Sequence, residues 1–380
     1  MADLTTRYAG LVLCNPLIIA PAGITGTVEL VLRAEDAGAG AVVMKSLFEN
    51  PIPRAGDPSP HMRLIERRIG RLRASTFYSY EQSSHFDELQ YAEEIRRAKE
   101  QVDIPVIASL DCITEEGWVR YARLMGEAGA DGVEIKSCPH GLHQMSGEEL
   151  TEATRIVRKA IQLPLVPKLL PQNTNPLRTV LDLEQAGADA VVMFNRFSGL
   201  DIDLDNERPI MHGGYAGHGG PWSIYYCLRW IATAYPHLSI PISGSGGVWE
   251  GTDLVKYILA GATTVQVCSA VCLQGYEIVP RLLHGLQEWM EGKGYSTPAE
   301  FQGRAAERVL GLQKMDRWRL LRAEIVESCT GCGLCDRVCI YFAIEAEPEY
   351  HVIAEKCVGC GLCGEVCPVG AIKMAERTGN

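Results

Sequence analysis

The sequence reads CTGCGLCDRVC over residues 329–339 and CVGCGLCGEVC over residues 357–367, so one spacing of four cysteines occurs twice. Each run has the form C-x2-C-x2-C-x3-C, which is typical of a segment that holds a [4Fe–4S] cluster on thiolates. In proteins with two such runs, the fourth cysteine of each run ligates the cluster of the other run. The spacing therefore predicts two clusters, one on Cys329, Cys332, Cys335 and Cys367, and the other on Cys357, Cys360, Cys363 and Cys339.

The spacing also limits the alternatives. A structural zinc site usually takes its ligands as two C-x2-C pairs, which differs from three closely spaced cysteines and a fourth. Disulfide bonds are not expected in a chain of this size without a secretion signal. The first run departs from the usual pattern, because Ile340 follows its fourth cysteine where the second run has Pro368. The doubled spacing still favours two [4Fe–4S] clusters.

The composition indicates one large domain with a sizeable core and a small additional module. The chain has 380 residues, of which 47% are hydrophobic, and its formal net charge of −11 argues against a nucleic-acid partner. The first seven residues show no signal-peptide pattern, and no apolar run reaches the length of a membrane span. The six cysteines outside the runs are scattered, as expected for thiols in a reducing compartment. These features predict a cytoplasmic protein without a membrane span.

A second pattern recurs before the cysteine runs, in which Ala-Gly-Ala precedes a short apolar or β-branched run. It occurs at residues 37–39, 128–130, 186–188 and 260–262. Glycine ends a helix, and a continuous apolar run is typical of a strand covered on both faces. Residues 11–23 predict a hairpin that leads into a buried strand. Further strands at residues 105–110, 165–169 and 240–243 bring the total to eight.

Eight alternating strand and helix units in about 290 residues predict a closed (β/α)8 barrel, the TIM barrel of the α/β class. An open, doubly wound sheet is the alternative, since periodicity alone does not establish closure. We assign the barrel to residues 1–295, a polar helical linker to residues 296–322 and a small α+β ferredoxin-like domain to residues 323–380. In such a barrel the chemistry lies at the C-terminal ends of the strands.

Two kinds of residue are notable at the predicted strand ends. The glycine-rich segment 244–247 follows the seventh strand, and Ser269 with Ala270 follows the eighth, where barrels bind phosphate on backbone N–H groups. Taken alone, the glycines could equally form only a tight turn. Lys45 and Lys168 lie at the ends of the second and fifth strands, where burying an unpaired ammonium is costly. The lysines therefore indicate ligand binding rather than packing.

The motifs along the barrel resemble those of the FMN-dependent dihydroorotate dehydrogenase and dihydropyrimidine dehydrogenase family. The similarity extends from about Leu11 to Val271, and the module with two cysteine runs looks like that of the dihydropyrimidine dehydrogenases. The residues that carry the resemblance are Asn15-Pro16, residues 20–23, Lys45-Ser46, residues 137–141, Lys168, Asn195, Gly214, Gly217, Gly246-Gly247 and residues 266–271.

This resemblance implies that FMN lies across the mouth of the barrel. The cofactor-binding residues would be Ala20, Ala22, Gly23, Lys45, Ser46, Lys168, Asn195, Gly217, Gly246, Gly247, Ser269 and Ala270. Lys168 would lie near flavin N1, where a cation stabilises the reduced ring. The family's general acid or base would be Cys138, because hydride exchange at one carbon requires proton exchange at its neighbour. The simpler interpretation of Cys138 is a buried thiol.

The chain departs from the family where the family binds a pyrimidine ring. The stretch from Glu134 to Cys138 lacks the family's asparagine, Arg196 replaces a serine or threonine, and residues 75–81 lack another asparagine. Losing buried amides that form hydrogen bonds with a ring's polar groups changes substrate preference strongly. Lys136 and Arg196 indicate an anionic group on the substrate instead. We assign substrate binding to Lys136, Asn195, Arg196 and Tyr78.

A basic run could add to this positive charge. It comprises Arg63, Arg67, Arg68, Arg71 and Arg73. A run of charges is more typical of a solvated helix face, and we expect that structure here.

The motifs together predict an iron–sulfur flavoprotein oxidoreductase that reduces or oxidises a C–C bond adjacent to a carbonyl. Hydride would pass through FMN N5, the proton through Cys138, and electrons through the two clusters. No G-x-G-x-x-G fingerprint opens a βαβ unit, so the electron partner is expected to be a ferredoxin or a subunit that binds FAD or NAD(P)H.

Other functions remain open at this point. One is a non-catalytic subunit that relays electrons through FMN and clusters within a larger complex. Another is a barrel that has lost FMN and only binds a ligand. For the assembly, the family resemblance implies a homodimer or membership of a hetero-oligomer.

Overall fold

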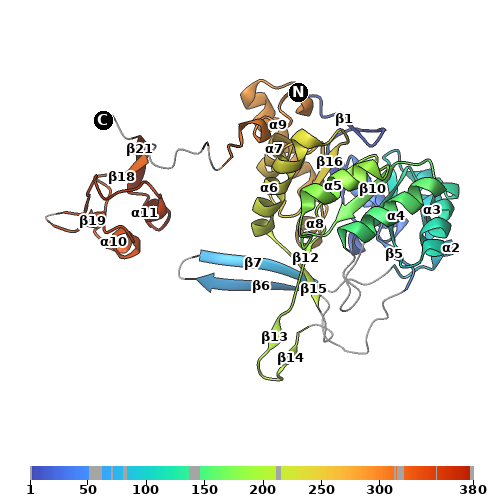
Figure 1. Cartoon of the computed structure of the whole chain (residues 1–380), viewed down its shortest axis with the longest axis horizontal. Helices are drawn as coiled ribbons and strands as arrows, with labels where there is room; N and C mark the ends of the chain where they lie inside the picture. Colours follow the sequence, from blue (N-terminus) through green and yellow to red (C-terminus); the bar gives the residue numbers. More distant parts are fainter. Residues whose placement is uncertain are drawn as a thin grey trace. The chain divides into compact units, whose positions relative to one another are not determined.

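The computed structural model describes residues 2–50, 62–69, 72–79, 84–136, 146–210, 215–311, 314, 321–347 and 349–376 (Figure 1). The chain divides into two compact units, Met1–Val309 and Leu310–Asn380. This boundary lies within residues 296–322, whose described part contains two short 3-10 turns, η4 (Pro298–Glu300) and η5 (Ala306–Arg308).

Residues 296–309 belong to the first unit because they pack on it. Phe301 is fully buried, with its ring centroid 5.0 Å from that of Trp289. The N–H groups of Gly303 and Ala305 each donate at 2.9 Å to carbonyl groups at residues 258 and 259. A buried aromatic side chain and paired backbone groups thus hold this segment to the barrel.

The first unit is a closed barrel of eight parallel strands. In spatial order they are β3 (Leu17–Ile19), β4 (Ala41–Val43), β8 (Val106–Asp111), β9 (Gly132–Lys136), β10 (Leu165–Leu169), β11 (Val191–Met193), β16 (Ile242–Ser245) and β17 (Thr264–Val267). The ring closes where β17 pairs with β3, in the register that sets Val265 opposite Leu17. The predicted barrel is confirmed, and the open sheet is excluded. A short strand, β5 (Leu47–Phe48), pairs in parallel with the last two residues of β8.

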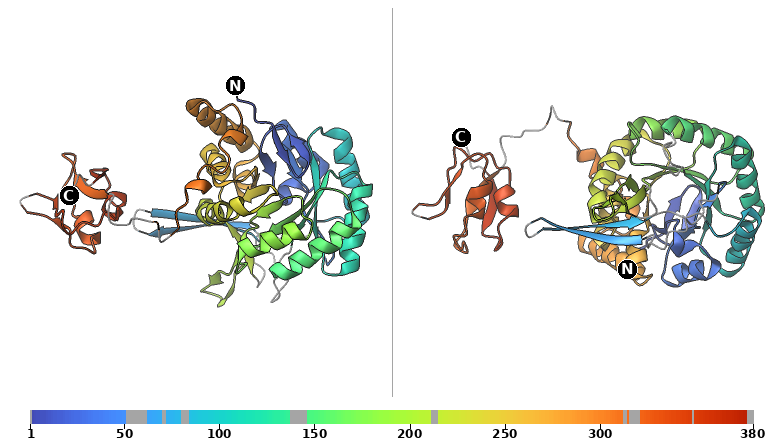
Figure 2. Two further views of the ribbon diagram at one scale, coloured as in Figure 1. Left: turned by 45° about the horizontal axis from the view of Figure 1, so that its top comes forward. Right: turned by 90° about the horizontal axis from the view of Figure 1, so that it is seen from below.

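Helices surround the strands (Figure 2). They are α1 (Val28–Asp36), α2 (Glu88–Gln101), α3 (Glu115–Glu127), α4 (Gly147–Ala160), α5 (Pro176–Gln185), α6 (Ile224–Ala234), α7 (Gly251–Ala260), α8 (Ser269–Gln274) and α9 (Ile278–Lys293), with short turns η1 (Gly23–Thr25), η2 (Pro221–Ser223) and η3 (Tyr235–His237). The glycine of each Ala-Gly-Ala segment has a positive φ, between 89° and 114°, which residues with a side chain rarely adopt. These glycines end helices, as the sequence pattern predicts.

The two ends of the barrel interior differ in chemistry. A hairpin of β1 (Thr6–Tyr8) and β2 (Leu11–Leu13) contributes Tyr8 and Leu13 to an apolar cluster with interior residues of the strands, including Ile18, Ile107 and Val166. The C-terminal parts of the strands, and the segment after β4, instead carry buried polar residues, among them Ser46, Ser109, Glu134, Lys168 and Gln266. Buried polar groups are costly unless they are paired, so this end is the candidate site.

An additional antiparallel sheet lies beside the polar end of the barrel. Its order is β12 (Phe197–Gly199), β15 (Ala216–Gly219), β7 (Leu72–Ser79) and β6 (Met62–Ile69), and β13 (Ile202–Asp203) pairs with β14 (Arg208–Pro209) nearby. The hairpin of β6 and β7 projects beyond the barrel (Figures 1 and 2). The expectation of a helix for the basic run is therefore wrong, because residues 62–69 pair along their length with residues 72–79.

The second unit is a small α+β domain. Strand β18 (Leu321–Ile325) pairs with β21 (Ile372–Glu376), and β19 (Ile344–Glu345) pairs with β20 (His351–Val352). Two short helices, α10 (Leu334–Val338) and α11 (Leu362–Glu365), lie within the two cysteine runs. The ferredoxin-like fold predicted from the spacing is confirmed. Across the described residues of both units, no helix combines the length and apolarity that a membrane span requires.

Candidate functional site

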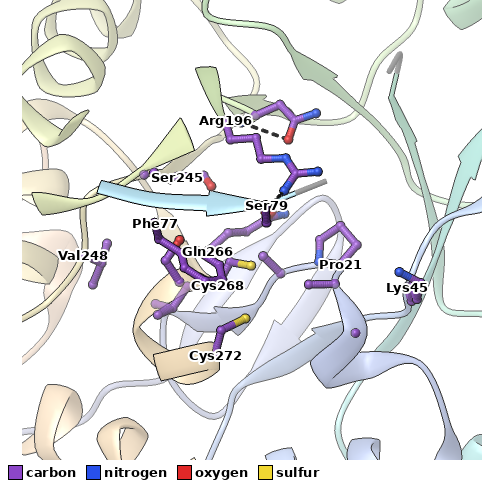
Figure 3. A pocket seen from close by; sticks show the side chains of 18 of the residues that line it. Pro21, Lys45, Phe77, Ser79, Arg196, Ser245, Val248, Gln266, Cys268 and Cys272 are labelled. Carbon is purple, nitrogen blue, oxygen red and sulfur yellow. Dashed lines mark hydrogen bonds between the residues drawn. The ribbon is translucent and has the colours of Figure 1, made fainter. Parts of the chain in front are cut away.

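A cavity of about 400 Å³ opens at the C-terminal ends of the barrel strands (Figure 3). Its size is typical of a small-molecule or cofactor site. Ten of the residues predicted to bind cofactor or substrate line it: Ala20, Ala22, Gly23, Lys45, Lys168, Asn195, Arg196, Gly246, Gly247 and Ser269. The closed topology brings these residues together from six different strand ends, although they are spread over about 250 residues of sequence.

Lys168 is held at the base of the cavity by two polar side chains. Its Nζ donates to Oε1 of Gln266 at 2.6 Å and lies 3.4 Å from Oε1 of Glu134. Nε2 of Gln266 in turn donates to Oε2 of Glu134 at 2.6 Å. All three side chains are at most 4% exposed. An ammonium has three N–H donors, so these two acceptors do not use the full hydrogen-bonding capacity of Lys168.

A glycine turn provides a close backbone approach on another wall of the cavity. Gly246 and Gly247 have φ values of 115° and 70°, and a Cβ on Gly247 would lie 2.5 Å from the backbone nitrogen of Ile224. Only glycine therefore fits where this turn meets the start of α6. Backbone N–H groups at such a turn and at helix N-termini, with a nearby hydroxyl such as that of Ser269, suit a phosphate group. The residues present fit the phosphate of FMN.

Arg196 crosses the cavity from the end of β11 to the additional sheet. Its guanidinium donates to the Oγ of Ser79 on β7, and its backbone N–H donates to Oδ1 of Asn195 at 2.9 Å (Figure 3). A Cβ on Gly217 would lie 2.0 Å from Cδ of Arg196, so glycine at that position leaves room for the arginine. The sheet thereby fixes a guanidinium at the cavity wall, where it can bind an anionic group.

Several predicted residues lie elsewhere within the described part of the chain. Ser46 is buried, with its Oγ 2.8 Å from that of Ser109, and Ala270 is fully buried in α8. Lys136 is 2% exposed, its Nζ lies 5.1 Å from the ring centroid of Phe48, and it does not line the cavity. Gly217 contributes through the space that it leaves for Arg196.

The structure describes neither Cys138 nor the side chain of Tyr78. Cys138 belongs to residues 137–145, which are not described, so its predicted catalytic role is untested. The backbone of Tyr78 lies in β7 and pairs with His218, but its side chain is not described.

The cavity also contains residues that the sequence did not single out. Phe77 and Ser79 reach it from β7, and their alternation with Tyr78 is the strand periodicity that could have revealed them. His218 lies on β15; burial lowers its pKa, and Asp201 and Arg196 act on it with opposite signs. Cys272, which also lines the cavity, has its pKa raised by a hydrogen bond with Cys268 and by burial.

The cysteines of the second unit form two sets. One small space is lined by Cys339, Cys357, Cys360 and Cys363, and another by Cys329, Cys332, Cys335 and Cys367. Each set thus takes three cysteines from one run and the fourth from the other run. We call them the second and first cysteine cages, respectively. Within the described residues, no three His, Cys, Asp or Glu side chains converge closely enough for a single metal ion.

Both cages are built from the same local turns. The glycines at residues 331, 333, 359 and 361 have φ values between 66° and 81°. A Cβ on Gly359 would lie 2.1 Å from the carbonyl oxygen of Leu321, so the backbone packs tightly there. The N–H four residues after the fourth cysteine donates to its Sγ in both runs, at 3.3 Å to Cys339 and 3.2 Å to Cys367. Thiolates with N–H donors and a closely wrapped backbone fit a [4Fe–4S] cluster in each cage.

Comparison with protein families identifies both units. The family model described as dihydroorotate dehydrogenase matches residues 3–290. The model described as a 4Fe-4S binding domain matches residues 350–373, which contain the second cysteine run but not the first.

Curated proteins similar to this chain carry two kinds of name. Dihydroorotate dehydrogenase B (NAD(+)), catalytic subunit, of Pyrococcus abyssi is 32% identical over 308 residues, which cover 80% of this chain and 99% of that protein. The protein of the same name from Methanosarcina mazei is 34% identical over 308 residues, covering 79% and 94%. The NAD-dependent dihydropyrimidine dehydrogenase subunit PreA of Escherichia coli K12 is 30% identical over 352 residues, covering 88% and 84%.

Proposed function

The chain belongs to the dihydroorotate dehydrogenase family, and from this premise we propose that it transfers electrons between a C–C bond beside a carbonyl group and a separate redox protein. It is an FMN- and iron–sulfur-dependent oxidoreductase that acts on CH–CH groups. The observation that carries the proposal is the convergence of Lys168, Arg196 and the Gly246-Gly247 turn on one cavity. The cation, the anion-binding arginine and the phosphate turn are the three features that a flavin and its substrate require.

Different residues of the cavity would bind the phosphate and the ring of FMN. When bound, FMN would supply hydride exchange at N5. The N–H groups of Gly246 and Gly247, with the hydroxyl of Ser269, would bind the phosphate, and Lys168 would bind the ring. Glu134 and Gln266 fix the position of Lys168, so its positive charge would be preorganised for a bound flavin.

The substrate in this proposal carries an anionic group. Arg196 lines the cavity with its guanidinium held by Ser79. A carboxylate or similar group bound by Arg196 would orient the adjacent C–C bond over the flavin site. Asn195, whose side chain accepts from the N–H of Arg196, belongs to the same wall.

Cys138 is the proposed general acid or base. It follows β9, whose last residue, Lys136, lies opposite Lys168 of β10 in the barrel. A thiol with an unperturbed pKa of about 8.5 can donate or accept a proton near neutral pH when its surroundings adjust it. The proton moves between this thiol and the carbon next to the one that exchanges hydride.

Two clusters in the cysteine cages would carry the electrons onward. The cages contain the two sets of four cysteines that the crossover rule assigns. The relatives from P. abyssi and E. coli are each named as one subunit of an NAD-linked enzyme. We therefore include an FAD- or NAD(P)H-binding subunit, or a ferredoxin, as the electron partner, within a homodimer or a hetero-oligomer.

Anaerobic turnover measurements test this function. The protein is purified without oxygen, reduced by dithionite, desalted and mixed with unsaturated carbonyl compounds in pairs that differ only in a carboxylate. The expected result is reoxidation of the flavin by the carboxylate member of a pair, visible as recovery of flavin absorbance. Equal rates with both members would contradict the anionic substrate, and a preparation without flavin would contradict the proposal as a whole.

A further inference from the structure

The turns after the fourth cysteine of the two runs have one geometry but different residues. Each contains a residue with a left-handed backbone three positions after the cysteine, with φ of 64° at Gly370 and 50° at Phe342. Glycine adopts this conformation freely, whereas a bulky side chain is strained in it. The first run therefore has an aromatic residue where the fold favours glycine.

The strained residue is also exposed. Phe342 is 78% exposed, and its neighbours Ile340 and Tyr341 are 73% and 42% exposed. Exposed apolar groups that lie together mark interaction sites, and backbone strain is concentrated at functional positions. The two observations point to this turn as a contact surface for another molecule.

The turn lies directly against the second cysteine cage. Cys339, which precedes it, is a member of the cage, and Tyr341 lines the same space. Leu362 lines that space too and is 44% exposed. We call Ile340, Tyr341, Phe342 and Leu362 the apolar surface of the second cage. A molecule in contact with this surface would be separated from the cage by a few side chains only.

Acidic residues lie next to this surface along the chain. The hairpin of β19 and β20, whose Ile344 and Val352 line the second cage, carries the exposed residues Glu345, Glu347 and Glu349. Across residues 323–376 there are nine acidic and three basic residues. The basic groups near Glu345 are His351 at 3.8 Å and Lys356 at 4.0 Å, which is the outer limit of an ion pair. Exposed acidic residues therefore follow the apolar surface along the chain.

We propose that the apolar surface of the second cage is the docking site for a redox protein whose cofactor lies beneath an apolar patch with a basic rim. This inference rests on the proposed function, because it requires a cluster in the second cage. Each encounter moves one electron, so the cluster is oxidised as the partner's cofactor is reduced, or the reverse. Two encounters balance one two-electron reaction at the flavin.

Cytochrome c is a suitable probe, because lysines surround its exposed haem edge. The full chain is reduced by dithionite, desalted anaerobically and mixed in a stopped-flow instrument with cytochrome c or with the small acceptor dichlorophenolindophenol. Phe342→Gly is the test variant, since Gly370 shows that glycine suits the turn. Val369→Ser, at a 48% exposed position of the equivalent turn beside the first cage, is the matched control.

We expect Phe342→Gly to lower the second-order rate constant with cytochrome c about tenfold, which is a usual loss for an aromatic interface anchor. Val369→Ser should stay near the wild-type rate, and the rate with the small acceptor should be unchanged in both variants. The wild-type rate should fall with added salt, and Glu347→Gln combined with Glu349→Gln should weaken that dependence.

Three results would overturn the proposal, and each contradicts a different part of it. An unchanged rate with cytochrome c in Phe342→Gly would remove the docking site alone. An unchanged rate together with a smaller sedimentation coefficient of that variant would assign the surface to contact between copies of this chain. A wild-type protein that reduces neither acceptor would remove the cluster and, with it, the proposed function.

Discussion

Each cysteine cage of the second unit takes three of its four members from seven consecutive residues, whereas the base of the barrel cavity takes Glu134, Lys168 and Gln266 from three separate strands. The cages depend on a few glycine turns and one crossover between two runs. The cavity depends on the register of every strand pair that closes the barrel. A local change should therefore damage one cage and spare the other, but a change in the cavity should act through several partners.

The largest expected effect tests two points: whether each cage holds its cluster independently, and whether each takes its fourth cysteine from the other run. The wild-type protein should hold about eight irons and eight sulfides, and Cys332→Ser or Cys339→Ser alone should leave about four of each. Cys339→Ser combined with Cys360→Ser should still leave about four, because both residues belong to the second cage. Cys339→Ser combined with Cys332→Ser should lose nearly all. Iron and sulfide assays on anaerobic preparations measure this.

The control for that series is Cys14→Ser, which changes an exposed cysteine outside the runs. Loss of all iron in the pair Cys339→Ser and Cys360→Ser would show that Cys339 serves its own run.

The next largest expected effect is a loss of turnover at the barrel. Cys138→Ala should lower turnover roughly 10²–10⁴-fold, which is the usual contribution of general acid–base catalysis. Cys138→Ser should keep a fraction of activity at high pH, because a hydroxyl is a weaker acid than a thiol. Reduction of bound flavin by dithionite should proceed at its normal rate, since it needs no proton donor at the substrate. Steady-state and stopped-flow measurements separate the two half-reactions, and normal turnover of the alanine variant would argue against this role.

A smaller effect is expected at the wall that Arg196 forms with the additional sheet. Arg196→Met should lower kcat/KM for an anionic substrate roughly 10–100-fold, the value of a lost charge-assisted hydrogen bond. The corresponding neutral ester should react at the same rate with both proteins. Ser79→Ala should give a weaker loss of the same kind, because it removes one hydrogen bond that positions the guanidinium. Equal losses for the acid and the ester would indicate a structural role for Arg196.

The smallest effect tests the buried group of three at the base of the cavity. Lys168→Ala should weaken FMN retention and lower the flavin midpoint potential, and Glu134→Gln should raise the potential, each by roughly 30–60 mV. Redox titration of the two variants checks the signs. Shifts of the same sign would mean that charge at this site does not control the flavin.

The difference between the two units also explains what the sequence could predict. The cage members follow from spacing, because three of each four lie within seven residues and the glycines between them impose the turn. The barrel strands follow from apolar runs that need cover on both faces. The partnership of Glu134 with Gln266 does not follow from the sequence, since 132 residues separate the two and only the closed register brings them together.

The projecting hairpin of β6 and β7 was mispredicted because its sequence shows no strand period and its sheet depends on a distant strand. Residues 62–69 contain arginines and a glutamate without a continuous apolar face, so no period in the sequence favours a strand. The pairing of β7 with β15 joins Ser79 to Gly217, about 140 residues later. The contact made by the Lys136 side chain could not be predicted from the sequence either. A strand after residues 128–130 was predicted, but the contact of the Lys136 ammonium with the Phe48 ring depends on β5, which pairs with β8.

The pairing of β3 with β17 has a consequence for biosynthesis. The first strand of the ring has its second neighbour about 250 residues later, so the ring cannot close until residue 267 has been synthesised. Contacts of such separation are slow to form, because the intervening chain must first be ordered. The β17 side of the cavity, including Gln266 and Ser269, is therefore completed late, and FMN should bind only after the whole barrel has emerged from the ribosome. The cysteine runs, which span 39 residues, can fold around their clusters on a much shorter timescale.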